Sequence, residues 1–84
     1  MTIKILGPGC MNCKTLYRRT LEAVAALGIQ AEVEKVEDLE GIASYGIMRT
    51  PGMVIDEKVV WQGGVPSVAV IGRLVTEAMA ASAV

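Results

Sequence analysis

The two cysteines of this chain, Cys10 and Cys13, are the residues whose type and spacing point most directly to chemistry. They lie between a β-like run, Thr2–Leu6, and a helical pattern that extends from Thr15 to Leu27. A helix that begins near Cys10 would point unpaired backbone N–H groups at that sulfur. Because these groups carry partial positive charge, they favour a thiolate over a thiol. The sequence therefore predicts a reactive Cys10.

The stabilisation of the thiolate that a reactive Cys10 requires is modest. A free cysteine ionises near pH ~8.5, which leaves about 3% thiolate at pH 7. Surroundings that bring a thiol to half ionisation at that pH must supply about 2 kcal/mol, an amount that a helix N-terminus and one cation can provide. Lys14 is such a cation, because it follows Cys10 by four residues and so lies on the same helix face.

The spacing of Cys10 and Cys13 also suits a disulfide. Residues three apart in a helical turn have Cα atoms about 5 Å apart, a separation that a disulfide tolerates. Closing so small a ring constrains the unfolded chain by only about 2 kcal/mol. A stabilising crosslink would join distant segments, so we interpret the pair as a reversible redox switch.

Composition restricts the remaining classes of function. The 84 residues predict a single domain, 1–84, and 52% hydrophobic residues are enough for a core that needs no crosslink. A net charge of -1, no basic run and no Phe make a nucleic-acid partner unexpected. The lack of histidine removes Ser-His and Cys-His catalysis. We expect no membrane segment and a cytoplasmic location, because no signal peptide and no apolar run of ~20 residues is present.

The order of predicted elements positions the cysteines. After the first strand and helix, the patterns predict a strand, a short helix, two strands and a last helix: Ile29–Val36, Leu39–Tyr45, Met53–Ile55, Lys58–Trp61 and a helix opened by Val65-Pro66-Ser67. This βαβαββα order predicts an α/β fold with a four-stranded mixed sheet and helices on both faces. The cysteines then follow the C-terminal end of a parallel strand, where sites form in such sheets.

Two local expectations accompany this fold. The predicted core face of the first helix recurs at spacings of three and four: Cys13, Leu16, Tyr17, Thr20, Leu21, Val24 and Leu27. Asp56-Glu57 joins the last two strands but is not a favoured pair for a tight turn, so we expect a loop longer than two residues.

Three motifs together resemble the thioredoxin/glutaredoxin superfamily, and in particular its small thioredoxin-like redox-active disulfide proteins. They are the C-x-x-C pair after a first strand, Thr50-Pro51 ahead of a later strand, and Gly63-Gly64-Val65-Pro66-Ser67 before the last helix. The resemblance covers the whole chain. It implies a thioredoxin-like fold and a thiol–disulfide oxidoreductase that acts on disulfide-containing proteins and is re-reduced by a reductase or a small thiol.

The resemblance also implies roles for individual residues. Cys10 would be the nucleophile and Cys13 the buried resolving thiol, with no cofactor and no metal. Pro51 would be a cis-proline beside the disulfide, and Thr50 would offer its backbone to an extended substrate segment. In this reaction the Cys10 thiolate attacks a substrate disulfide, and Cys13 then displaces the reduced substrate.

One departure from that family leaves the deprotonation of Cys13 unexplained. Typical thioredoxins carry a carboxylate on the strand that enters the motif, whereas this strand carries Lys4 and no acid, so the proton acceptor for Cys13 is not identified.

The alternative function is a metal-binding module of the copper-chaperone type, in which Cys10 and Cys13 would bind the ion. Such modules follow a βαββαβ order and end on a strand.

Overall fold

In the computed structural model, which describes residues 1–82, the chain forms four strands and three helices. In chain order they are β1 (Thr2–Leu6), α1 (Met11–Leu27), β2 (Glu32–Val36), α2 (Leu39–Ser44), β3 (Gly52–Ile55), β4 (Lys58–Gln62) and α3 (Val68–Ser82). The predicted βαβαββα order is confirmed, and β1 has the predicted bounds. It differs from the βαββαβ order of the alternative metal-binding module. Within residues 1–82, no helix is both long and apolar enough to cross a membrane.

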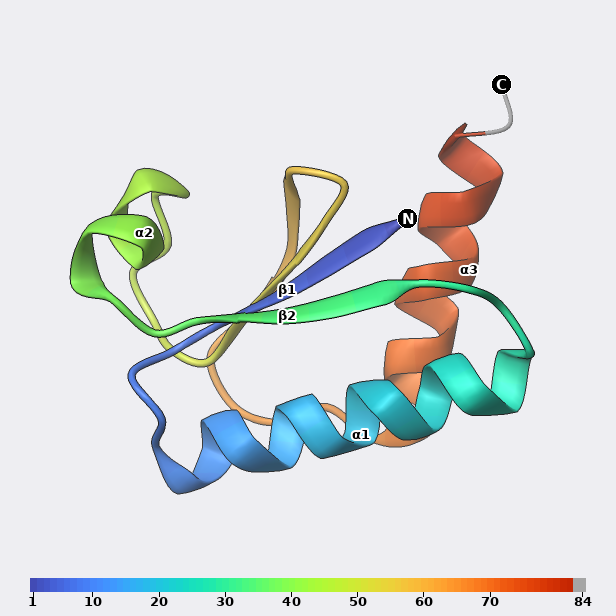
Figure 1. Ribbon diagram of the computed structural model, residues 1–84, viewed down its shortest axis with the longest axis horizontal. Coiled ribbons are helices and arrows are strands. Elements are labelled where there is room, and N and C mark those ends of the chain that lie inside the picture. Colours follow the sequence, from blue (N-terminus) through green and yellow to red (C-terminus); the bar gives the residue numbers. More distant parts are fainter. Residues whose placement is uncertain (83–84) are drawn as a thin grey trace.

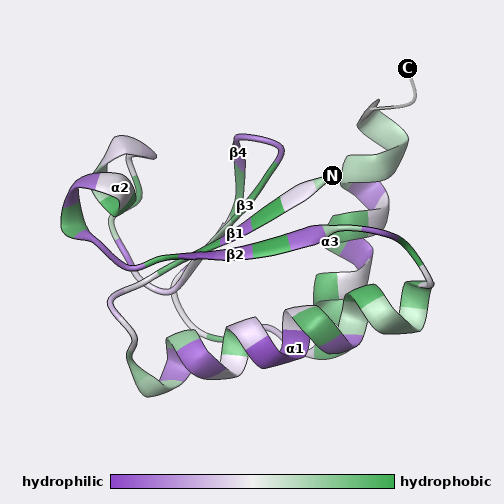
Figure 2. Ribbon diagram, viewed as in Figure 1, coloured by the Kyte–Doolittle hydropathy of each residue, from purple (hydrophilic) through white to green (hydrophobic). Residues whose placement is uncertain are grey.

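The strands form a mixed sheet in the order β2-β1-β3-β4. β1 and β2 are parallel, because α1 crosses over between them, whereas β3 is antiparallel to both β1 and β4. α1 and α3 pack on one face, and α2 lies at the far end of the molecule from α3 (Figure 1). This arrangement confirms the predicted fold class. It also leaves β2 as an edge strand, in which two valines lie among three charged residues (Figure 2).

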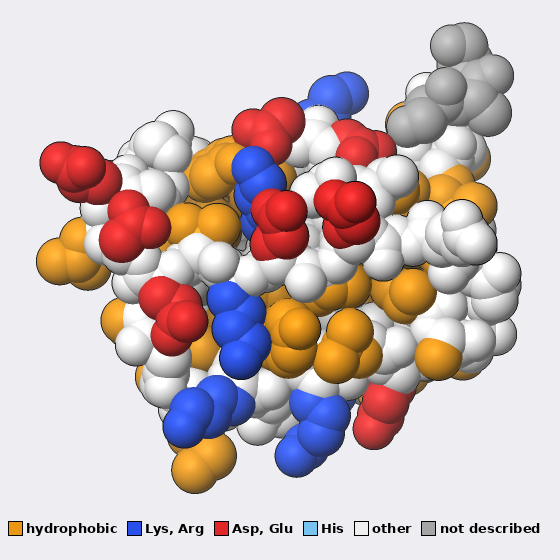
Figure 3. All heavy atoms as spheres, in the orientation of Figure 1, with side chains coloured by type: hydrophobic (Ala, Val, Ile, Leu, Met, Phe, Trp, Pro, Cys, Tyr) orange, Lys and Arg blue, Asp and Glu red, His pale blue; other side chains and the backbone are white. Residues whose placement is uncertain are grey.

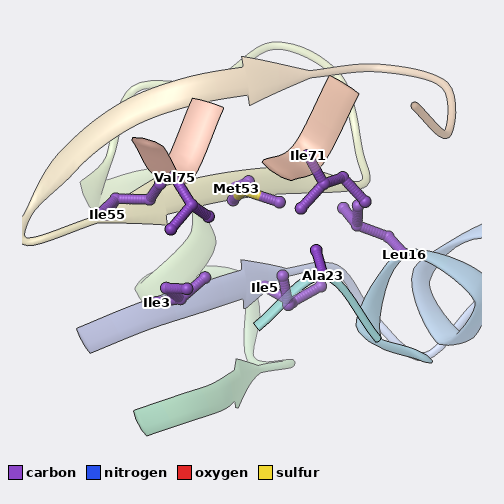
Figure 4. Packing of buried hydrophobic residues seen from close by; sticks show 8 residues of the cluster. All are labelled: Ile3, Ile5, Leu16, Ala23, Met53, Ile55, Ile71 and Val75. Carbon is purple, nitrogen blue, oxygen red and sulfur yellow. The ribbon is translucent and has the colours of Figure 1, made fainter. Parts of the chain in front are cut away.

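The main core lies between the sheet and the pair α1 and α3. Figure 4 shows side chains from two strands and two helices converging there: Ile3, Ile5, Leu16, Ala23, Met53, Ile55, Ile71 and Val75. A smaller cluster of Leu6, Ile42 and Val54 lies on the other face, under α2. Burial of these apolar side chains is the main favourable term that holds the helices on the sheet.

The buried stripe of α1 is narrower than predicted. Cys13, Leu16, Thr20 and Ala23 are buried, but Leu21 and Leu27 remain 43% and 41% exposed. Because a helix turns about 100° per residue, Leu21 lies beside the stripe rather than within it, and Leu27 belongs to the last turn. The apolar pattern therefore overestimated the face that α1 buries.

The turn between β3 and β4 is also tighter than predicted. Ile55 pairs with Lys58, so Asp56 and Glu57 alone form the loop, with φ angles of 47° and 71°. This left-handed backbone is unfavourable for most residues other than Gly, Asn and Asp. Tertiary contacts compensate: the Thr2 N–H donates to Asp56 Oδ1 at 2.9 Å, and Lys4 Nζ pairs with Glu57 Oε1 at 2.8 Å. The expected longer loop was wrong because sequence propensity omits these contacts.

Candidate active site

The segment that leaves β1 brings both cysteines to the start of α1. The Gly7 N–H donates to the Val36 carbonyl at 3.0 Å, which ties the ends of the two parallel strands together. α1 begins at Met11, and Cys10 is its N-cap residue with extended backbone angles. The Cys10 Sγ accepts a hydrogen bond from the Cys13 N–H at 3.2 Å. An N–H group that has no backbone partner within the helix therefore donates to the first cysteine sulfur.

Cys10 and Cys13 are joined as a disulfide, with Cα atoms 5.0 Å apart. Their environments differ, because Cys10 is exposed whereas Cys13 is only 5% exposed and packs into the base of α1. A molecule that approaches from solvent therefore meets Cys10 first. This asymmetry would allow one sulfur to react with a partner while the other attacks from inside the protein.

Gly7 lies between the buried cysteine and the proline that precedes β3. A Cβ atom on Gly7 would overlap the Sγ of Cys13 and lie 3.8 Å from the Cα of Pro51. The Thr50–Pro51 peptide bond is cis, Pro51 is buried and Thr50 is exposed. The structure therefore brings Pro51 close to Cys13, although 38 positions separate them in the sequence. The sequence analysis did not predict this close packing.

A small cavity of about 40 Å³ adjoins Cys13 on the side of β2. Besides Cys13, it is lined by Ile5, Gly7, Gly9, Lys14, Lys35 and Glu37. Lys14 thus lies beside the cysteine pair with an exposed side chain, and the ammonium of Lys35 lies 4.5 Å from the centroid of the Tyr17 ring. The sequence analysis missed Lys35 and Glu37. Their position at the C-terminal end of the parallel strand beside β1 is the signal that could have found them.

Residues 1–82 contain no group of three or more His, Cys, Asp and Glu side chains that could hold a metal ion. The site brings together two sulfurs in unequal environments, with two ammonium groups and one carboxylate nearby.

Comparison with known proteins relates this arrangement to a family. The family described as "Thioredoxin domain" matches residues 1–76, which include the disulfide, Pro51 and the start of α3. The chain belongs to the thioredoxin family. The thioredoxin of Methanocaldococcus jannaschii is 41% identical over 68 residues, covering 81% of this chain and 78% of that protein. The thioredoxin of Methanothermobacter thermautotrophicus is 40% identical over 67 residues, covering 80% of this chain and 87% of that protein.

A solved structure supports the same fold. Thioredoxin 1 from the thermophilic eubacterium Thermosipho africanus superposes with a TM-score of 0.60 over the full length of both chains, at 16% sequence identity. Together, the thioredoxin relatives and the Cys10–Cys13 disulfide support a thiol–disulfide redox function.

Proposed function

We propose that this thioredoxin-family protein is a thiol–disulfide oxidoreductase that exchanges electrons with disulfide-containing proteins. The observation that carries the proposal is the asymmetry of the pair: Cys10 is exposed at the N-cap of α1, and Cys13 is buried one turn further on. The exposed sulfur is the nucleophile and the buried sulfur is the resolving thiol. The 5.0 Å between their Cα atoms allows the pair to close and reopen without rearrangement of the sheet.

The proposed reaction takes place in two exchange steps. The Cys10 thiolate attacks one sulfur of a substrate disulfide, which forms a mixed disulfide and releases the other substrate sulfur as a thiolate. Cys13 then attacks the Cys10 sulfur, which forms the Cys10–Cys13 disulfide and releases the second substrate thiolate. The protein loses two electrons and the substrate gains them. A reductase or a small thiol reverses the change in the protein and completes the cycle.

We assign three further residues to this site by proposal. Lys14 contributes a positive charge that favours the Cys10 thiolate, since it follows Cys10 by one helical turn and is exposed. The exposed Thr50 offers its backbone to an extended substrate segment, and Pro51 holds the adjoining chain close to Cys13. The expected cytoplasmic location also belongs to this proposal, because a reducing compartment would keep the pair available for exchange.

A trapping experiment tests the proposal. In a Cys13→Ser variant, the second exchange step is blocked, so a purified protein with an accessible disulfide should remain attached to Cys10. The adduct should appear on a non-reducing gel and disappear with dithiothreitol. A Cys10→Ser variant is the matched control and should form no adduct. Equal adduct formation by both variants, or none by Cys13→Ser, would refute the assigned roles.

A further inference from the structure

The two exchange steps do not say which group accepts the proton that Cys13 must lose. Cys13 is 5% exposed, and burial in apolar surroundings disfavours a thiolate. Yet Cys13 must lose its proton to attack, because the thiolate is the nucleophile in exchange. Lys4, the charged residue on the strand that enters the motif, donates hydrogen bonds to Tyr45 at the end of α2 and to Glu57 in the turn between β3 and β4. The proton must therefore leave by another group.

The cavity beside Cys13 supplies the candidates. Three of its lining residues besides Cys13 are titratable: Lys14 from α1, Lys35 from β2 and Glu37 just after β2. The other lining residues, Ile5, Gly7 and Gly9, carry no titratable side chain, and neither does Pro51, which also lies near Gly7. An ammonium group has no lone pair and cannot accept a proton, whereas a carboxylate accepts on either oxygen. Among these groups, Glu37 is the one that can act as the base.

The position of the Glu37 carboxylate suits that role. Its Oε2 lies so near the backbone before Cys10 that a Cβ atom on Gly9 would come within 3.0 Å of it. Cys13 and Glu37 both line the cavity of about 40 Å³, which is large enough to hold one water molecule. Acidic and basic side chains lie close together on this face, near the start of α1 (Figure 3). The ammonium groups of Lys14 and Lys35 would stabilise the negative charge while it forms on sulfur.

We infer that Glu37 is the proton acceptor for Cys13 during resolution of the mixed disulfide, acting through one water in this cavity. The inference rests on the proposed function. The Cys13 thiol passes its proton to the Glu37 carboxylate, and Cys13 Sγ forms a bond to Cys10 Sγ. The bond between Cys10 and the substrate sulfur breaks, and its electron pair leaves on the substrate. Glu37 then releases its proton to that thiolate or to solvent, which restores the carboxylate.

A two-phase reaction separates this step from the first attack. Reduced protein is mixed with an equimolar amount of dithiobis-nitrobenzoate, which releases one coloured thiolate when Cys10 attacks and a second when Cys13 resolves the adduct. In Glu37→Gln at pH 7, the second phase should slow by about tenfold or more, the lower range for loss of a general base, while the first stays within about twofold. The difference should shrink as pH rises, because solvent then deprotonates the thiol. Glu37→Asp, which keeps the carboxylate, should recover much of the rate.

The direction in which the rate of the second phase changes in Glu37→Gln distinguishes a proton acceptor from a fixed negative charge. If Glu37 were only a fixed negative charge, its removal would favour the Cys13 thiolate and the second phase would accelerate. Glu34→Gln removes the same charge from the opposite face of β2 and should leave both phases unchanged. An unchanged or faster second phase in Glu37→Gln, or equal slowing in Glu34→Gln, would overturn the inference. Loss of the first phase in the unsubstituted protein would instead refute the proposed function, and the inference with it.

Discussion

At the scale of single residues, the site depends on Gly7, which has no side chain. Gly7 lets the buried sulfur of Cys13 and the backbone of Pro51 approach the same point of the chain. This requirement is one of space, since Gly7 is not among the glycines with a positive φ angle. Gly7 is therefore required for packing, because it leaves room for the Sγ of Cys13.

Replacing Gly7 by alanine should destabilise the oxidised protein. The new Cβ would overlap Cys13 Sγ and lie 3.2 Å from Cys13 Cβ, and such overpacking costs about 1–3 kcal/mol. The free energy of unfolding from a denaturant titration measures the effect. Gly72→Ala is the matched control: it lies inside α3 with no atom within 4 Å of the added Cβ, so it should stabilise by up to about 1 kcal/mol. Equal stability of Gly7→Ala and the unsubstituted protein would show that the loop can move aside.

Replacing Lys14 by glutamine should slow the reaction of Cys10. A charge pair one helical turn apart is worth about 0.2–0.5 kcal/mol, so the rate of alkylation of the reduced protein by iodoacetamide at pH 7 should fall by about twofold. Lys58→Gln removes the same charge from an exposed position at the start of β4 and should leave the rate unchanged. Equal rates for all three proteins would remove Lys14 from the site.

At the scale of elements, three polar side chains join β1, the end of α2 and the turn between β3 and β4. Lys4 Nζ of β1 donates to the hydroxyl of Tyr45, at the end of α2, and to Glu57 in the β3–β4 turn, at 2.9 and 2.8 Å. The Tyr45 hydroxyl in turn donates to Glu57 Oε2 at 3.1 Å. The hydrogen bond from Lys4, followed by that from Tyr45, lowers the pKa of Glu57 below its ordinary value of 4.5.

This network should make stability sensitive to acid. Because the pKa of Glu57 is lowered in the folded protein, its contribution is present above pH 4.5 and is lost as pH falls through the lowered value. The hydrogen bond from Lys4 to Glu57 raises the pKa of Lys4, so that contribution persists through neutral pH and is lost only in strong base. Glu57→Gln should therefore unfold earlier than the unsubstituted protein at pH 7 in thermal melts.

The difference in melting temperature between Glu57→Gln and the unsubstituted protein should narrow as pH falls below 4.5 and Glu57 becomes protonated. Glu22→Gln, on the exposed side of α1, is the control and should not reproduce this pattern. A gap that stays constant with pH would mean that the charge of Glu57 is not what stabilises the turn.

At the scale of the whole molecule, the disulfide lies at one end of the structure and the main core is built without it. The core residues come from β1, β3, α1 and α3, and none of them is a cysteine. The pair can therefore be reduced while the helices stay packed on the sheet. A protein that cycles between two redox states needs a core that stays packed whether or not the disulfide is formed.

Reduction should lower stability without abolishing the fold. Opening so short a ring releases about 2 kcal/mol of constraint on the unfolded chain, which corresponds to a Tm lower by about 10 °C for a chain of this size. Thermal melts with and without dithiothreitol measure the difference, and the Cys10→Ser/Cys13→Ser double variant should melt near the reduced protein. Loss of cooperative unfolding on reduction would show that the core depends on the disulfide.

The sequence alone determined the element order, the bounds of β1 and the helix start at the cysteine pair. These features follow from local causes: apolar periodicity, the glycines that stop β1 and the cap at the start of α1. The tertiary structure decided which distant residues meet: Gly7 with Pro51, Glu37 beside Cys13, and Lys4 with Glu57 in a tight turn. Strand register and helix packing set those contacts, and neither is encoded in the spacing of neighbouring residues.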